Sequence, residues 1–149
     1  MALKETIESD IKKAMLAKDK DRLRALRAIK AAILLAETEK GADGGVSQEK
    51  EISILTKAAK QRRESADIFT QQGRPELAKG EVDELKVIEE YLPQQLSEEE
   101  LKEKLVGIIE KVGASSPKDM GKVMGVASKE LAGKADGKMI SSIVKQLLA

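Results

Sequence analysis

The last third of this chain contains two glycine-bearing segments, Asp119-Met-Gly-Lys-Val-Met-Gly125 and Gly133-Lys-Ala-Asp-Gly137, from which its local fold can be predicted. A glycine inside a helix costs roughly 0.8–1 kcal/mol relative to alanine, so two of them in a helical pattern need a physical reason. Because glycines four residues apart share one helix face, they let a neighbouring helix or a phosphate group come close. Packing against the preceding or the following helix is the simpler interpretation. The second stretch predicts a tight corner between two short helices, with Asp136 capping the second.

Apolar residues recur every three or four positions along the whole chain, which predicts helices throughout. The first helix is expected to end near Lys18 and the second before the glycine-rich loop at 41–45. Ser47 is expected to cap the third helix, Gly73 to end it, and Pro75 to open the fourth. The expected buried stripes are Leu3, Ile7, Ile11 and Met15; Leu23, Leu26, Ile29, Ile33 and Ala36; Ile52, Leu55, Ala59, Arg62, Ala66 and Phe69; and Val82, Leu85, Ile88 and Leu92.

Pro93 interrupts the pattern, and Ser97-Glu-Glu-Glu100 is a capping box that restarts it. We therefore expect an all-α protein of two domains. Residues 1–92 would form an N-terminal helical hairpin or bundle of about four helices, and residues 97–149 a C-terminal domain of three helices. A second capping box, Ser116-Pro-Lys-Asp119, is expected to start the helix that carries the two glycines.

Arg62 stands on a stripe that is otherwise apolar, and an unpaired charge there would be costly. We expect a structural ion pair with the fourth helix rather than a clamp on a substrate. No role follows for the adjacent Arg63. The acids available to Arg62 are Glu81, Glu84, Glu89 and Glu90.

The composition excludes several classes of chemistry. The chain has no histidine and no cysteine, which excludes histidine metal sites, Ser-His-Asp and Cys-His arrangements, and disulfides. We predict no catalytic residue, no metal site and no cofactor. The chain has one tyrosine, one phenylalanine and no tryptophan, so we expect no aromatic platform on which bases could stack. No apolar run is long enough for a membrane span and no signal pattern opens the chain, so we expect a cytoplasmic protein with no membrane partner.

Charge is distributed unevenly along the chain. Residues 1–92 are neutral, whereas residues 111–149 carry seven lysines against three acids, a net charge of +4. Lys118 and Lys122, four apart, are expected on one helix face, and Lys134 and Lys138 beside the predicted corner. The C-terminal end is therefore basic through lysine alone, which is compatible with either a solvated face or a phosphate-binding face.

The stretch from Asp119 to Gly137 resembles the tail domain of GatB, the tRNA-handling subunit of the glutamine-dependent amidotransferase. Through Tyr91-Leu-Pro-Gln-Gln-Leu-Ser-Glu-Glu-Glu-Leu101, the whole chain resembles the YqeY family. The resemblance implies a GatB-tail-like domain that binds tRNA or a similarly structured RNA by lysine–phosphate contacts. The RNA-binding residues expected on this basis are Lys118, Gly121, Lys122, Gly125, Lys129, Gly133, Lys134 and Lys138.

Two other functions remain open. A helical protein–protein adaptor that binds no RNA would use exposed apolar faces against a protein partner. A carbon–nitrogen ligase with glutamine as amido-N donor would follow from family association only, because nothing in the chain resembles the catalytic body of GatB.

Overall fold

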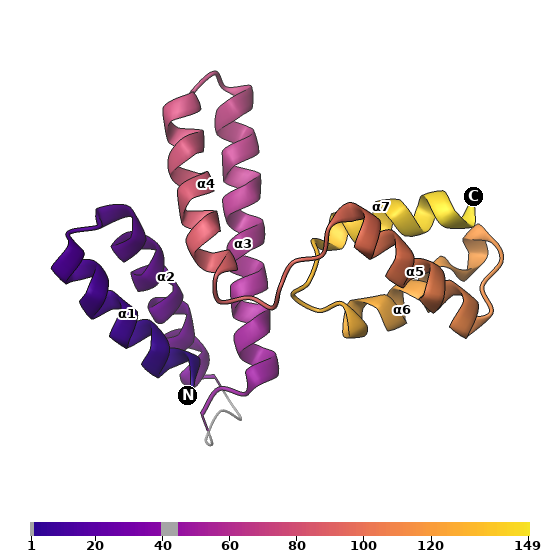
Figure 1. Cartoon of the computed structure of the whole chain (residues 1–149), viewed down its shortest axis with the longest axis horizontal. Helices are drawn as coiled ribbons and strands as arrows, with labels where there is room; N and C mark the ends of the chain where they lie inside the picture. The colour runs from indigo at the N-terminus through magenta and orange to yellow at the C-terminus, as the bar shows by residue number, and fades with distance from the viewer. Residues whose placement is uncertain (1, 40–44) are drawn as a thin grey trace. The chain divides into compact units, whose positions relative to one another are not determined.

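The computed structural model describes residues 2–39 and 45–149, and every regular element within these ranges is helical. The expected all-α class is confirmed for this part of the chain. The elements fall into two compact units, Met1–Leu92 and Pro93–Ala149 (Figure 1). They are α1 (Leu3–Ala17), α2 (Lys20–Glu37), α3 (Gln48–Gln71), α4 (Pro75–Glu89), α5 (Glu98–Val112), the short 3₁₀ turn η1 (Pro117–Asp119), α6 (Met120–Glu130) and α7 (Gly137–Leu148).

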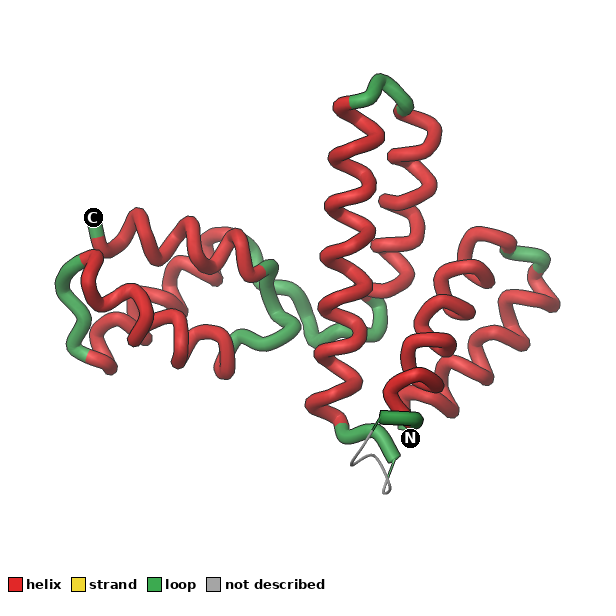
Figure 2. The backbone as a smooth tube through the Cα atoms, turned by 180° about the vertical axis from the view of Figure 1, so that it is seen from behind, coloured by secondary structure: helices red, strands yellow, loops and turns green. Residues whose placement is uncertain are grey.

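The first unit consists of two helical hairpins, α1–α2 and α3–α4, which the backbone tube of Figure 2 shows from behind. Lys18 ends α1 in the left-handed conformation, at φ 57°. The Ser47 side chain accepts a hydrogen bond from the Lys50 N–H at 3.1 Å, which caps α3. Gly73, at φ +72°, follows α3, and Pro75 is the first residue of α4. These four boundaries are confirmed, whereas the loop expected at 41–45 lies largely outside the described residues.

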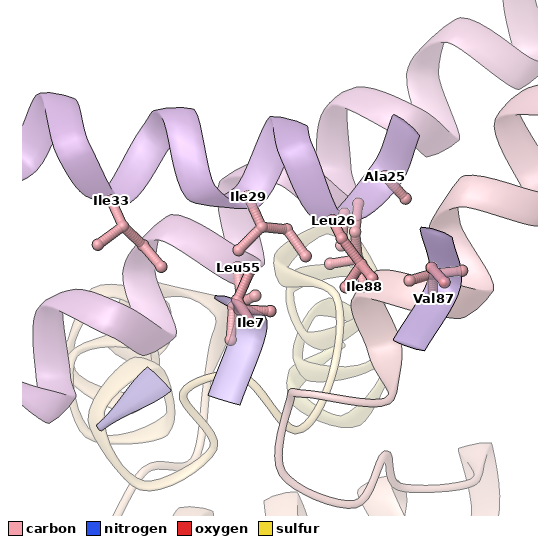
Figure 3. Packing of buried hydrophobic residues seen from close by; sticks show 10 residues of the cluster. Ile7, Ala25, Leu26, Ile29, Ile33, Leu55, Val87 and Ile88 are labelled. Carbon is pink, nitrogen blue, oxygen red and sulfur yellow. The ribbon is translucent and has the colours of Figure 1, made fainter. Parts of the chain in front are cut away.

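The core of the first unit is built from α1, α2, α3 and the end of α4. Figure 3 shows Ile7 and Leu55 facing the row of Ile29 and Ile33 along α2, with Ile88 closing one end. All five of these side chains are almost completely removed from water. Burial of each such side chain contributes roughly 1.5–3 kcal/mol, so this cluster holds the two hairpins together.

Two of the expected stripes are wrong at their ends. Met15 is 54% exposed and Ala14 is buried in its place. Because a helix has 3.6 residues per turn, residues spaced four apart rotate by about 40° around the helix axis at each step. After three such steps, Met15 lies about 120° away from Leu3. In α4, Val82 is exposed and Glu84 is buried.

The second unit is a bundle of three helices that all contact one another. The predicted capping box opens α5: the Glu100 N–H donates to Ser97 Oγ at 3.2 Å, and the Ser97 N–H donates to Glu100 Oε1 at 3.1 Å. Its core is fully buried and comes from α5, α6 and α7. These residues are Leu101, Leu105, Val123, Ala127 and Val144. Among the described helices of both units, none combines the length and the apolar character that crossing a bilayer requires.

Candidate nucleic-acid interface

Helix α6 has one face in the core and one face in solvent. Val123 and Ala127 point into the core of the second unit. The exposed positions lie one or two helical turns apart and therefore share the opposite side of the helix. We call these residues, with the exposed lysine of the preceding turn, the glycine–lysine face: Lys118, Gly121, Lys122, Gly125 and Lys129.

The glycines of this face do not serve helix packing. A Cβ atom built on Gly121 or on Gly125 would have no heavy atom of another element within 4 Å. The expectation that they face α5 or α7 is therefore wrong, because α6 packs through Val123 and Ala127 instead. What the two glycines provide is a strip of helix backbone that no side chain covers.

The lysines of this face are largely free of internal partners. Among the described residues, Lys118 and Lys129 form no ion pair, and both are exposed. Lys122 lies close enough to Asp119 for its charge to act on that carboxyl. The N–H groups of Ser115 and Ser116, at 2.9 and 3.3 Å, lower the pKa of the Asp119 carboxyl, and the Lys122 charge lowers it further.

The corner between α6 and α7 is present as predicted. Gly133 is buried at φ +75°, a left-handed conformation that favours glycine. Its carbonyl accepts from Gln95 Nε2 at 2.6 Å, and the Lys134 carbonyl accepts from the Leu96 N–H at 2.9 Å. Gly133 thus supports the corner from inside rather than presenting a surface.

The lysines of the corner differ in exposure. Lys134 is half-buried, whereas Lys138 is exposed in the first turn of α7. The Asp136 side chain accepts from the Lys138 N–H at 3.4 Å, so the predicted cap of this helix is confirmed.

Two exposed residues that the sequence analysis did not select lie beside these lysines. Ser128 follows Gly125 by three positions and Gly121 by seven, so its hydroxyl shares the glycine–lysine face. Lys145 follows Lys138 by seven positions on the exposed side of α7. Helical spacing alone would have found both residues.

Arg62 lies in the first unit and is internally paired, as expected. One of its guanidinium nitrogens is 3.1 Å from Glu81 Oε2 and 3.0 Å from Glu84 Oε2. The predicted ion pair with the fourth helix is therefore confirmed. In the described chain, no group of three or more acidic side chains is arranged to hold a metal ion.

The fold and this face define a small all-helical protein whose C-terminal three-helix unit exposes lysines around a bare strip of helix. The chain belongs to the YqeY family: the family described as "Yqey-like protein" matches residues 4–148, essentially the whole chain. The resemblance to the YqeY family is thus confirmed.

Three curated relatives of this chain carry one shared name. "Altered inheritance of mitochondria protein 41, mitochondrial" of Clavispora lusitaniae is 38% identical over 117 residues, which are 76% of this chain and 66% of the relative. The protein of the same name from Kluyveromyces lactis is 29% identical over 142 residues, 93% of this chain and 72% of the relative. The one from Eremothecium gossypii is 35% identical over 86 residues, 58% of this chain and 46% of the relative. The chain thus spans about half to three-quarters of the length of these relatives.

These names contradict the expected cytoplasmic location, because all three relatives are named as mitochondrial proteins. The expectation rested on missing cysteines and on the absence of spanning or signal segments. Those features report on disulfides and on membrane insertion, and they do not distinguish one reducing aqueous compartment from another.

Proposed function

We propose that this protein binds tRNA or a similarly structured RNA through the glycine–lysine face of its second unit. The observation that carries the proposal is that Gly121 and Gly125 are uncovered, while the exposed Lys129 of α6 and the exposed Lys118 of the preceding turn have no ion-pair partner among the described residues. A face kept only for solubility would need no glycine there, since alanine would make a more stable helix. The resemblance to the GatB tail supports the same assignment.

The proposed mechanism is electrostatic and depends on shape. Without a Cβ at Gly121 and Gly125, a sugar–phosphate backbone can lie directly along α6, with the ammonium groups of Lys118, Lys122 and Lys129 against its phosphates. The chain has no arginine after Arg74 and no aromatic residue after Tyr91. Recognition therefore follows the backbone and the fold of the RNA rather than the base edges.

The proposal assigns separate roles to the two units. We infer that residues 97–149 form a GatB-tail-like RNA-binding domain and that residues 1–92 form a separate helical domain. The corner fixed by Gly133 would set the angle between α6 and α7 and so place Lys134 and Lys138 beside the face. In this arrangement Gly133 contributes to binding only by holding the corner.

Binding of total tRNA to the full chain across a salt series tests the proposal. Each lysine–phosphate contact adds roughly 0.7–0.9 to the slope of log affinity against log salt. The triple variant Lys118→Gln, Lys122→Gln, Lys129→Gln should bind more weakly, with a slope lower by about two to three.

The matched control replaces exposed lysines of the first unit, Lys57→Gln, Lys60→Gln and Lys86→Gln, with the same change in net charge. This control should retain wild-type affinity and slope. If the wild type binds no tRNA at low salt, or if the control loses as much affinity as the triple variant, the proposal fails.

A second candidate, the protein–protein adaptor, is favoured by a groove of about 460 Å³ between α2 and α3. Small and apolar side chains from both helices line it, among them Ala28, Ala32, Ile54 and Ala58. Ala28→Trp would fill the groove. Loss of a defined partner complex in that variant, together with no RNA binding by the wild type, would favour the adaptor. The carbon–nitrogen ligase alternative rests on family association and has no observation in its favour.

A further inference from the structure

The corner between α1 and α2 presents two apolar side chains to solvent in the middle of a basic segment. The segment reads Lys12-Lys-Ala-Met-Leu-Ala-Lys-Asp-Lys20, and we call it the α1–α2 corner. Leu16 is 86% exposed, the highest value among the exposed large apolar side chains of the described chain, and Met15 beside it is 54% exposed. Figures 1 and 2 show this corner at the end of its hairpin, away from α3 and α4.

The exposure of Met15 and Leu16 is built into a well-defined turn. Ala14, the residue before them, is buried in the core, and its carbonyl accepts from the Asp19 N–H at 3.0 Å. The Lys18 N–H donates to the Met15 carbonyl at 3.2 Å. Asp19 then caps α2 by accepting from the Arg22 N–H at 3.1 Å. Because both sides of the turn are tied, the two apolar side chains cannot fold back onto the core without breaking it.

The charges around this apolar pair are mainly positive and mainly unpaired. Lys12, Lys18 and Lys20 are exposed and form no ion pair among the described residues. Lys13 is 4.0 Å from Asp10, at the limit for an ion pair. The segment holds a single acid, Asp19, so its net charge is +3.

We propose that the α1–α2 corner is a peripheral contact site for an anionic phospholipid surface. Leu16 and Met15 enter the boundary between headgroups and acyl chains, and the lysines lie among the headgroup phosphates. The positive charge of the α1–α2 corner is complementary to an anionic surface. A bilayer fits better than a protein partner, because protein interfaces are depleted in lysine, whereas lysine stems readily extend from an apolar surface to a charged headgroup layer. This peripheral mode requires no membrane-spanning helix.

Sedimentation of the full chain with vesicles tests the proposal. One set of vesicles contains phosphatidylcholine alone, and the other contains phosphatidylcholine with about one-third phosphatidylserine. The wild type should bind the anionic vesicles and not the neutral ones. The double variant Met15→Gln, Leu16→Gln should weaken binding by about tenfold or more. In the triple variant Lys12→Gln, Lys18→Gln, Lys20→Gln, each lost lysine should weaken vesicle binding by about fivefold.

The chain offers matched controls for both changes. Leu34→Gln with Leu35→Gln removes two adjacent exposed leucines from α2, and Leu35 is 69% exposed. Lys57→Gln, Lys60→Gln, Lys86→Gln removes three lysines elsewhere in the same unit. Both controls should bind like the wild type, and circular dichroism should show every variant to be folded.

Four outcomes would overturn the proposal. The wild type could fail to bind anionic vesicles at low salt, or bind neutral vesicles equally well. The Leu34 and Leu35 control could lose as much binding as the corner variant. Finally, the Lys118, Lys122 and Lys129 variant could abolish vesicle binding that the corner variants leave intact, which would place the lipid contact on the other unit.

Discussion

The guanidinium of Arg62 lies 3.0 Å from the carboxylate of Glu84, and this pair joins α3 to α4 inside the first unit. Glu84 is 7% exposed and is the only charged or polar residue that is buried in the described chain. Its second oxygen accepts from Arg24 Nε of α2 at 2.5 Å. One carboxylate thus ties three helices together. Without the Glu84 carboxylate, Arg62 would keep only Glu81 and Arg24 only Asp21, so each guanidinium would lose one of its two acidic partners.

We expect Glu84→Gln to lower the free energy of unfolding by about 1–3 kcal/mol, because Arg62 and Arg24 lose a charged acceptor while remaining partly hydrated. Glu89→Gln, on the same helix and half-buried, should change it by less than about 0.5 kcal/mol. Chemical denaturation followed by circular dichroism measures both values. Equal effects of the two substitutions would show that the pair contributes no more than an ordinary surface carboxylate.

Tyr91 provides a prediction that depends on pH. Its hydroxyl donates to Asp10 Oδ2 at 2.5 Å and accepts from Arg22 at 3.3 Å. Burial and then the Asp10 carboxylate raise the pKa of Tyr91 above its usual value of about 10. The folded state therefore holds the phenolic proton more tightly than the unfolded state. This contribution to stability is present below pH of about 10 and is lost as the pH rises beyond that value.

Two measurements check this expectation. Since the chain has one tyrosine and no tryptophan, phenolate absorbance reports Tyr91 alone and should titrate above pH 10 or so in the folded protein. Tyr91→Phe should cost about 1–2 kcal/mol near neutral pH, and this cost should shrink in alkaline solution. Titration at the ordinary value in the folded protein would contradict the hydrogen bond to Asp10.

Because the α6 backbone at Gly125 is uncovered, we expect a substitution there to have opposite effects on stability and on RNA binding. Because a Cβ there meets open space, Gly125→Ala should stabilise the protein by about 0.5–1 kcal/mol. It should also weaken RNA binding if the backbone of α6 lies against phosphates. Gly107→Ala in α5 is the control, since Gly107 is also helical, exposed and without close neighbours. It should give a similar stabilisation and leave RNA affinity unchanged. Thermal melts and tRNA binding measured on the same samples separate the two effects.

Asp119 provides a prediction for acid conditions. The pKa of its carboxyl is lowered by the Ser115 and Ser116 N–H groups, so its contribution to stability is present above the ordinary pKa of about 3.9 and is lost as the pH falls through the lowered value. Asp119→Asn should therefore be less stable than the wild type at neutral pH, and the difference should shrink in acid. Melts across this pH range check it, with Glu110→Gln as the control on an exposed acid of α5. A difference that does not change with pH would exclude the carboxylate as the cause.

Local chemistry made the helix boundaries readable from the sequence. Ser47, Pro75 and Gly73 act on backbone groups within a few residues of themselves, so their effects hold in any tertiary arrangement. The Arg62 ion pair was predictable for a different reason. A charge on an apolar stripe must find a partner, and the fourth helix follows close along the chain.

The candidate site was only partly predictable. The lysines of α6 could be assigned to one face by spacing, whereas the side of the helix on which Gly121 and Gly125 lie depends on how α6 packs. Gly133 was selected as a binding residue, but the structure places it inside the corner, held by Gln95. A sequence pattern identifies which residues share a face and does not tell whether that face meets another helix or water.

The order of residues along the chain was enough to predict the helical class, the starts and ends of the helices, the corner at Gly133 and the membership of the YqeY family. These properties depend on residues near one another along the chain, or on the motif as a whole. The packing of the helices was needed to show that Met15 and Leu16 are exposed, that Glu84 is buried, and that the glycines of α6 lie open. Burial depends on which helices meet, and that is set by the packing of side chains far apart in the sequence.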